Sequence, residues 1–183
     1  MKNLTISTIL TLFVFLLAGC NGEETTDRTQ QDAVVDDDVR TIEVIGTDDM
    51  KFVVTQEQEG LVTGGAVGQF ILLEAIEASP GEEIRITLTT ISNLPPTAMS
   101  HNLTILTADA DTDAFARASI QARDNDYIAP EYEDWVIALT AMLGDGESDT
   151  ITFTAPEETG EYDYLCTFPG HYSGGMVGTL IVQ

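Results

Sequence analysis

Short segments with alternating apolar and polar residues dominate the sequence from residue 41 to its end, and they constrain its fold more than any other feature. Ile84, Ile86 and Leu88, for example, recur at every second position, which is the period of a β-strand with one buried face. About eight or nine strands broken by turns indicate an all-β protein built as a two-sheet sandwich. We expect them at Thr41–Ile45, Lys51–Thr55, Gln69–Glu77, Glu83–Thr90, His101–Leu106, Asp134–Leu139, Asp149–Thr154, Glu161–Thr167 and Val177–Val182.

Two segments depart from this pattern. Thr112–Arg123 begins with a candidate N-cap followed by an acidic residue, and it ends with a basic residue. Phe115 and Ile120 have helical spacing within it, so we expect one short helix outside the sandwich. Glu57–Gly68 is rich in glycine and predicts a mobile loop.

A loop between the last two predicted strands carries a concentration of metal-binding side chains. Its sequence is Cys166-Thr-Phe-Pro-Gly-His171-Tyr-Ser-Gly-Gly-Met176, and its proline and glycines supply the bends of a tight loop. The sequence has two histidines, and the other is His101. A thiolate, two imidazoles and a thioether are the ligands of a mononuclear blue copper site. The sequence therefore predicts a copper centre at His101, Cys166, His171 and Met176.

The strand before this loop orients the cysteine. On a period of two, Tyr162, Tyr164 and Cys166 share one face, which places the thiol beside an apolar, aromatic interior. Burial raises the pKa of a thiol, but a bound metal keeps it deprotonated. A zinc site is an alternative for cysteine and two histidines, although a thioether is a poor fourth ligand for zinc.

The N-terminus has the features of an exported lipoprotein. Residues 1–20 have a charged start and an apolar centre, and their ending, Leu17-Ala-Gly-Cys20, resembles a bacterial lipobox. We expect cleavage before Cys20 and lipid modification of that residue; a transmembrane helix or an ordinary cleaved leader is the alternative. Residues 21–40 are polar and acidic and predict a disordered tether, which leaves residues 41–183 as one domain.

The sequence has two cysteines. If Cys20 carries lipid, Cys166 has no disulfide partner, and a lone thiol in an oxidising compartment is at risk unless a metal occupies it. An inert core cysteine or a bridge between Cys20 and Cys166 remains the alternative.

The formal net charge is −24, and cleavage of the leader would remove Lys2 and make it more negative. This charge argues against binding to nucleic acid or to anionic lipid surfaces. An acidic surface adapted to high salt, a face that steers a basic partner such as a c-type cytochrome, and simple solubility all fit it.

Several motifs together resemble one protein family. These are Met99-Ser-His-Asn102, the stretch from Cys166 to His171 with the following Met176, Gly46-Thr-Asp-Asp-Met-Lys-Phe52, Asn93-Leu-Pro95 and Gly160-Glu-Tyr162. They closely resemble the azurin and auracyanin branch of the cupredoxins, which are blue copper proteins, over most of residues 41–183. Four residues between His171 and Met176 are one more than azurin has and resemble auracyanin.

The resemblance implies a Greek-key cupredoxin sandwich and a role for each site residue. It implies that His101, Cys166 and His171 are the trigonal copper ligands and that Met176 is the axial one. The Ser100 carbonyl lies where azurins place a glycine carbonyl as a distant axial contact. By the same resemblance, Asn102 ties the two ligand loops together and Phe168 helps to exclude water from the sulfur.

The resemblance also implies a one-electron carrier and not an enzyme, because a second copper centre would need more histidines. The electron would leave through His171 and an apolar docking patch of Leu94, Pro95, Pro96, Met99, Phe168, Pro169 and Tyr172. We expect a monomer on the periplasmic or extracellular face of a bacterial membrane. Its donor would be a c-type cytochrome or a quinol-oxidising complex, and its acceptor a terminal oxidase or a photosynthetic reaction centre. A copper chaperone is the alternative function.

Overall fold

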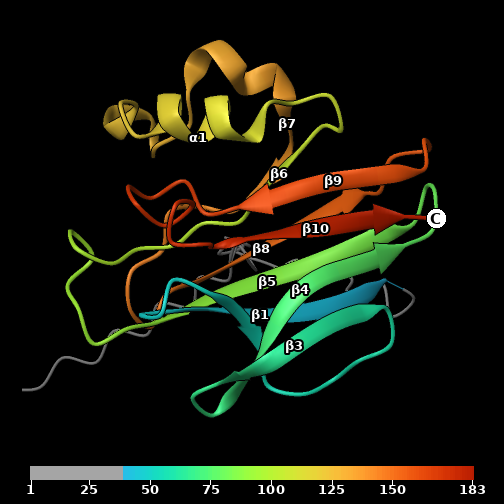
Figure 1. The fold of residues 1–183 in the computed structure, drawn as a ribbon, viewed down its shortest axis with the longest axis horizontal. Coiled ribbons are helices and arrows are strands. Elements are labelled where there is room, and N and C mark those ends of the chain that lie inside the picture. The colour runs from blue at the N-terminus through green and yellow to red at the C-terminus, as the bar shows by residue number, and fades with distance from the viewer. Residues whose placement is uncertain (1–38) are drawn as a thin grey trace, which may run out of the picture. The chain divides into compact units, whose positions relative to one another are not determined.

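A computed structural model describes residues 39–183 of the chain. The leader, Cys20 and almost all of the predicted tether lie outside the described residues. No helix among the described residues has the length and apolar character needed to cross a membrane. The elements, labelled in Figure 1, are β1 (Arg40–Thr47), β2 (Phe52–Val54), β3 (Leu61–Val67), β4 (Phe70–Ala78), β5 (Glu83–Ile91), β6 (Thr104–Leu106), α1 (Thr112–Ser119), the 3₁₀ helices η1 (Arg123–Asn125) and η2 (Pro130–Trp135), β7 (Val136–Leu139), β8 (Ser148–Thr154), β9 (Gly160–Leu165) and β10 (Val177–Val182).

The strands form a barrel-like sandwich in the order β7-β6-β9-β10-β4-β2-β1-β5-β8, with β3 paired to β4. Most neighbouring strands are antiparallel, but β1 runs parallel to β5 and β10 runs parallel to β4. A parallel pair requires a crossover connection, so strands far apart in the sequence become neighbours. The predicted all-β sandwich is confirmed.

The core forms because alternating residues of β1 and β5 point to the same side. Ile42 lies opposite Ile86, and Val44 lies opposite Leu88, in the parallel register. All four side chains are buried in one hydrophobic cluster. Burying a side chain of this size contributes about 1.5–3 kcal/mol.

Tyr162, Tyr164 and Cys166 also enter this cluster, as the period of two predicts. The Tyr164 ring packs edge to face on Phe52, with ring centroids 5.5 Å apart. Gly178 lies opposite Tyr164 in β10, and a Cβ there would lie 2.3 Å from the tyrosine side chain. A residue without a side chain is therefore required at position 178.

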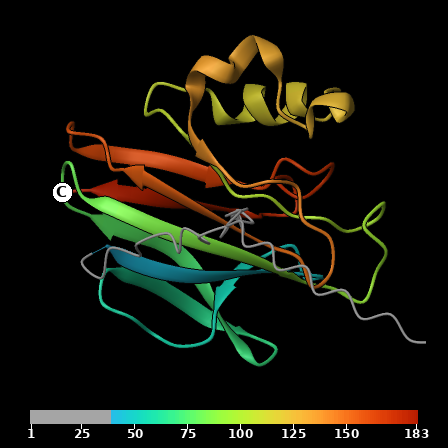
Figure 2. The same ribbon diagram turned by 180° about the vertical axis from the view of Figure 1, so that it is seen from behind.

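The helix lies outside the sandwich, above β6 and β9, as both views show (Figures 1 and 2). Its N-cap is Asp111 and not Thr112, because the Asp111 carboxylate accepts a hydrogen bond from the backbone of Ala114. Phe115 is buried in a second cluster with Leu106 and Leu165. Ile120 is 41% exposed, so it does not share the buried face.

The predicted mobile loop at 57–68 is wrong. Most of it forms β3, which pairs with β4 along its length, and Gly68 occupies the tight turn between them with φ of +61°. The register shifts between Thr63 and Ala66, so Gly64 and Gly65 are accommodated as an irregularity within a strand. Another boundary differs: β6 begins at Thr104, and His101 is held instead by an isolated bridge to Leu143.

Candidate metal centre

Three of the predicted ligands come together in the interior. Ligand atoms of His101, Cys166 and His171 lie within 4.8 Å of one another, and all three residues are buried. The Cys166 sulfur lies 3.4 Å from Nδ1 of His171 and 3.9 Å from Nδ1 of His101. The two imidazole rings have centroids 4.8 Å apart. A sulfur and two ring nitrogens therefore converge on one point.

Separate parts of the sandwich position these three side chains. Cys166 follows the last residue of β9, so its side chain continues the buried face of that strand. His101 and Leu143 exchange two backbone hydrogen bonds, of 2.9 and 2.8 Å. Gly46, in β1, packs against the ring of His101, and a Cβ there would lie 2.8 Å from ring atoms. Glycine at this position allows the backbone to support the imidazole directly.

A helical turn joins His171 to Met176. The Met176 N–H donates to the His171 carbonyl over 2.9 Å, and the Gly175 N–H donates to the Tyr172 carbonyl over 2.9 Å. Gly175 has φ of +82°. These features define a Schellman motif, in which a left-handed residue ends the turn and the following N–H reaches back five residues. The separation of His171 and Met176 in the sequence is therefore the separation that a Schellman motif requires between the two ends of its long hydrogen bond.

Met176 is also tied to the cysteine. The Cys166 N–H donates to the Met176 carbonyl over 3.1 Å, and the Met176 side chain is fully buried in the main core cluster. The turn thus returns the chain to the cysteine, and the fourth predicted ligand enters the same interior as the thiol.

The electrostatics favour uncharged groups as long as no cation is bound. Burial raises the pKa of the Cys166 thiol to about 12, although the backbone N–H groups of Asn102 and Phe168 act in the opposite direction. Burial lowers the pKa of both His101 and His171 to about 4. The charge of His171 lowers the pKa of His101 further, and Asp48 opposes this effect.

The site fits a copper ion. The lowered pKa of both imidazoles favours their neutral forms at pH 7, and Nδ1 of each ring faces the sulfur, where in its unprotonated form it would offer a lone pair to a metal. Nε2 of His101 is buried without a hydrogen-bond partner among the described residues. One thiol and two imidazoles form a soft nitrogen and sulfur donor set, which suits copper better than hard cations.

The predicted supporting residues lie around this cluster. The Asn102 side chain donates to Thr167 Oγ1 and accepts from the Thr167 N–H, each over 2.8 Å, so it bridges the two loops that carry the ligands. The Ser100 carbonyl faces the Cys166 sulfur at 3.9 Å. The Ser100 hydroxyl turns away and donates to the Pro96 carbonyl over 2.8 Å. Serine therefore leaves its carbonyl directed at the site.

The residues of the predicted docking patch differ in exposure. Leu94 is 44% exposed, and Pro95 and Pro96 beside it are also exposed. Phe168, Pro169 and Tyr172 are half-buried. Met99 is only 8% exposed. His171 is only 2% exposed, and the Phe168 ring packs against it with a centroid distance of 4.8 Å.

Comparisons with known proteins agree with this geometry. The family model for copper-binding proteins of the plastocyanin/azurin family matches residues 65–183. The chain belongs to the plastocyanin/azurin family. Azurin from Pseudomonas aeruginosa is 35% identical over 104 residues, which make up 56% of this chain and 69% of that protein. The fold and donor set of this plastocyanin/azurin family member are those of a blue copper cupredoxin, and its cofactor is one type 1 copper ion.

Two further relatives extend the likeness. Outer membrane protein H.8 from Neisseria meningitidis serogroup B is 38% identical over 91 residues, which are 49% of this chain and 49% of that protein. The chain thus spans about half the length of the Neisseria protein. A reduced auracyanin from Roseiflexus castenholzii superposes with a TM-score of 0.56 and 28% identity, covering 78% of this chain and 96% of that chain.

Some residues that contact the site of this cupredoxin were not assigned a role from the sequence. Gly46 supports His101, Lys51 contacts the turn before Met176, and the Tyr127 ring packs on Phe168 with centroids 5.5 Å apart. The motif from Gly46 to Phe52 contributes to the family resemblance, but nothing in it indicates which distant loop it contacts. Tyr127 has no local signal at all.

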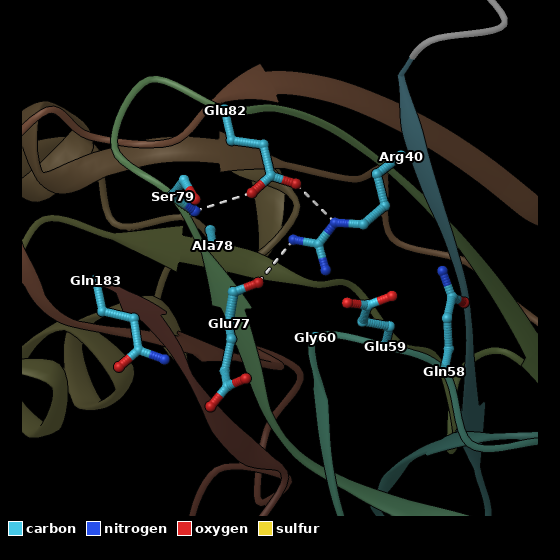
Figure 3. A pocket seen from close by; sticks show the side chains of 9 residues that line it. All are labelled: Arg40, Gln58, Glu59, Gly60, Glu77, Ala78, Ser79, Glu82 and Gln183. Atoms are coloured by element: carbon cyan, nitrogen blue, oxygen red, sulfur yellow. Dashed lines mark hydrogen bonds and ion pairs between the residues drawn. The ribbon is translucent and has the colours of Figure 1, made fainter.

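A separate hollow of about 720 Å³ lies at the other end of β10, beside Gln183 (Figure 3). Arg40 makes two polar contacts in this hollow. Its Nε pairs with Glu82 at 2.7 Å, and its Nη2 donates to the Glu77 carbonyl at 2.7 Å. Glu82 also accepts from the Ser79 N–H. These contacts close the end of the cupredoxin sandwich remote from the copper ligands.

Proposed function

We propose that this chain is an exported, lipid-anchored electron carrier with one type 1 copper ion bound by His101, Cys166, His171 and Met176. The observation that carries the proposal is the buried cluster of one thiol and two imidazoles, in a chain of the plastocyanin/azurin family. When bound, copper supplies a one-electron couple between Cu(II) and Cu(I).

The protein contributes a site whose ligands are already in place. The sulfur and both Nδ1 atoms converge on one point, so little ligand movement would be needed when the charge of the site changes. Asn102 holds the two ligand loops together through Thr167. Burial excludes water from Cys166 and His101. A buried site with its donor atoms already close together suits one-electron transfer.

His171 is the proposed point of electron exit. It lies between the exposed Gly170 and the half-buried Tyr172, and it is itself 2% exposed and packs against the Phe168 ring. The exposed Leu94 and Pro95 and the half-buried Phe168 and Tyr172 provide a small apolar docking patch. Small patches suit brief encounters, because weak redox complexes bury little surface.

The location and partners of the carrier are inferred from the sequence and its relatives. The ending Leu17-Ala-Gly-Cys20 resembles a lipobox, and the Neisseria relative is named an outer membrane protein. We propose that the chain is anchored through Cys20 to a bacterial membrane, on its periplasmic or extracellular face. We propose a c-type cytochrome or quinol-oxidising complex as donor, and a terminal oxidase or photosynthetic reaction centre as acceptor.

The deciding experiment is the visible and electron paramagnetic resonance spectrum of residues 21–183 after addition of Cu(II). An intense blue thiolate-to-copper band with narrow copper hyperfine splitting is expected, and Cys166→Ser should abolish both. A colourless protein or an ordinary square-planar copper spectrum would refute the electron-carrier proposal and favour copper delivery or zinc binding.

A further inference from the structure

The side chain of Lys51 contacts the ligand loop directly. Its Nζ donates to the Gly174 carbonyl over 2.8 Å and to the Gly175 carbonyl over 3.1 Å. Lys51 lies 123 residues before Gly174 in the sequence, in the turn between β1 and β2. A single ammonium group therefore connects this turn to the residues immediately before Met176.

The position of this contact is the C-terminal end of the Schellman turn. The last carbonyls of a helical turn have no partner within the turn, and they carry partial negative charge. A lysine can satisfy such carbonyls. The neighbouring Met50 reinforces the contact, because a Cβ on Gly174 would meet the Met50 side chain at 3.0 Å. Met50 itself has φ of +53°, a left-handed conformation that is uncommon for a residue with a side chain.

The same turn also holds the segment before His101. The Asp48 carboxylate accepts hydrogen bonds from the Ser92 hydroxyl and from the backbone N–H of Asn93. Asp48 and Lys51 thus attach one turn to both ligand-bearing loops, by charged groups of opposite sign.

Lys51 brings a positive charge to the ligand loop. Glu74 and Asp163 line the same hollow as Lys51, yet Lys51 makes no ion pair with any described residue. Two of the other basic residues in residues 39–183 are paired, Arg40 with Glu82 and Arg117 with Asp113. Lys51 therefore places an unpaired positive charge beside the ligand loop of a strongly acidic protein.

We propose that Lys51 is a positioning residue that fixes Met176 relative to the copper ion and raises the reduction potential of the site. The inference rests on the proposed function, since it takes Met176 as the axial ligand. Two effects act together: the ammonium holds the Gly175 carbonyl, which belongs to the peptide bond of Met176, and its charge disfavours Cu(II) relative to Cu(I).

The test compares reduction potentials of the copper-loaded full chain. Lys51→Met removes both the charge and the hydrogen bonds, and we expect it to shift the equilibrium toward Cu(II) by about threefold to tenfold. Lys51→Gln removes the charge but keeps one donor, so it should shift the equilibrium by a smaller factor. Lys51→Arg should behave as the wild type. Arg85→Gln is the matched control, because it removes one positive charge from β5, where Arg85 lies opposite Thr152.

A second measurement, made on the copper-free chain, reports how firmly the backbone of Met176 is held. Amide hydrogen exchange at Met176 in the copper-free chain should be faster in Lys51→Met than in Arg85→Gln, because the Schellman turn loses its cap. Equal shifts of potential in these two variants, or unchanged exchange at Met176, would overturn the inference while the blue spectrum stands. A wild type without the blue spectrum would instead overturn the proposed function.

Discussion

Removal of the Asn102 side chain tests how firmly the two ligand loops are joined. Asn102 is 1% exposed and Thr167 is 2% exposed, and two hydrogen bonds of 2.8 Å connect them. Asn102→Ala leaves the Thr167 N–H without its partner in the interior. An unsatisfied buried donor costs about 1–3 kcal/mol, and the small cavity adds to this. We expect a loss of about 2–4 kcal/mol in the free energy of unfolding.

The assay is urea unfolding of the copper-free chain, followed by far-UV circular dichroism. Asn93→Ala is the matched control, since the exposed Asn93 amide makes one side-chain bond of 3.3 Å to Asp48. That variant should lose less than about 1 kcal/mol. A loss in Asn102→Ala no larger than in Asn93→Ala would refute the view that this bridge is what joins the loops.

Three further predictions concern the core, the axial ligand and pH. Gly178→Ala should destabilise the chain by about 1–3 kcal/mol through overlap with Tyr164, and an unchanged urea midpoint would contradict this. Met176→Gln should keep the blue colour but lower the reduction potential, because an amide oxygen favours Cu(II) over Cu(I); an unchanged potential would count against Met176 as the axial ligand. The pKa of His101 and His171 in the fold is about 4, below the usual 6.5, so the unfolded chain binds more protons between these values. Stability of the copper-free chain should therefore fall as pH drops from 6.5 toward 4, by up to about 1.4 kcal/mol per pH unit for each imidazole. Urea unfolding at pH 7 and pH 4.5 checks this, and His171→Gln should show a smaller fall.

The strands were predictable where alternation was uninterrupted. In β5, each apolar residue of the pattern is buried, because the period of a strand matches the period of the sequence. The prediction failed at β3, where Gly64 and Gly65 suggested a loop. Pairing with β4 outweighs the low strand propensity of glycine. The propensity of single residues takes no account of such pairing between strands. The assignment of Ile120 to the buried helix face was also wrong, because a five-residue separation turns its side chain about 140° away from Phe115.

The site was predictable to the extent that it is local. Cys166, His171 and Met176 lie within one loop, so their spacing alone predicts that they can meet at one point. His101 was assigned because histidine is scarce in this chain and because its neighbours resemble a known motif. The contacts of Gly46 and Lys51 with this site could not be predicted, because each depends on an approach between residues distant in the chain.

Most of the strand pattern and the chemical identity of the donor set could be predicted from residue type and short spacing. The turn that supports the donors could be identified only in the folded chain. The parallel pairing of β1 with β5 places Gly46 opposite Thr90, and the pairing of β1 with β2 brings Lys51 to the ligand loop. Packing and charge act through space, so their partners are set by the path of the whole chain.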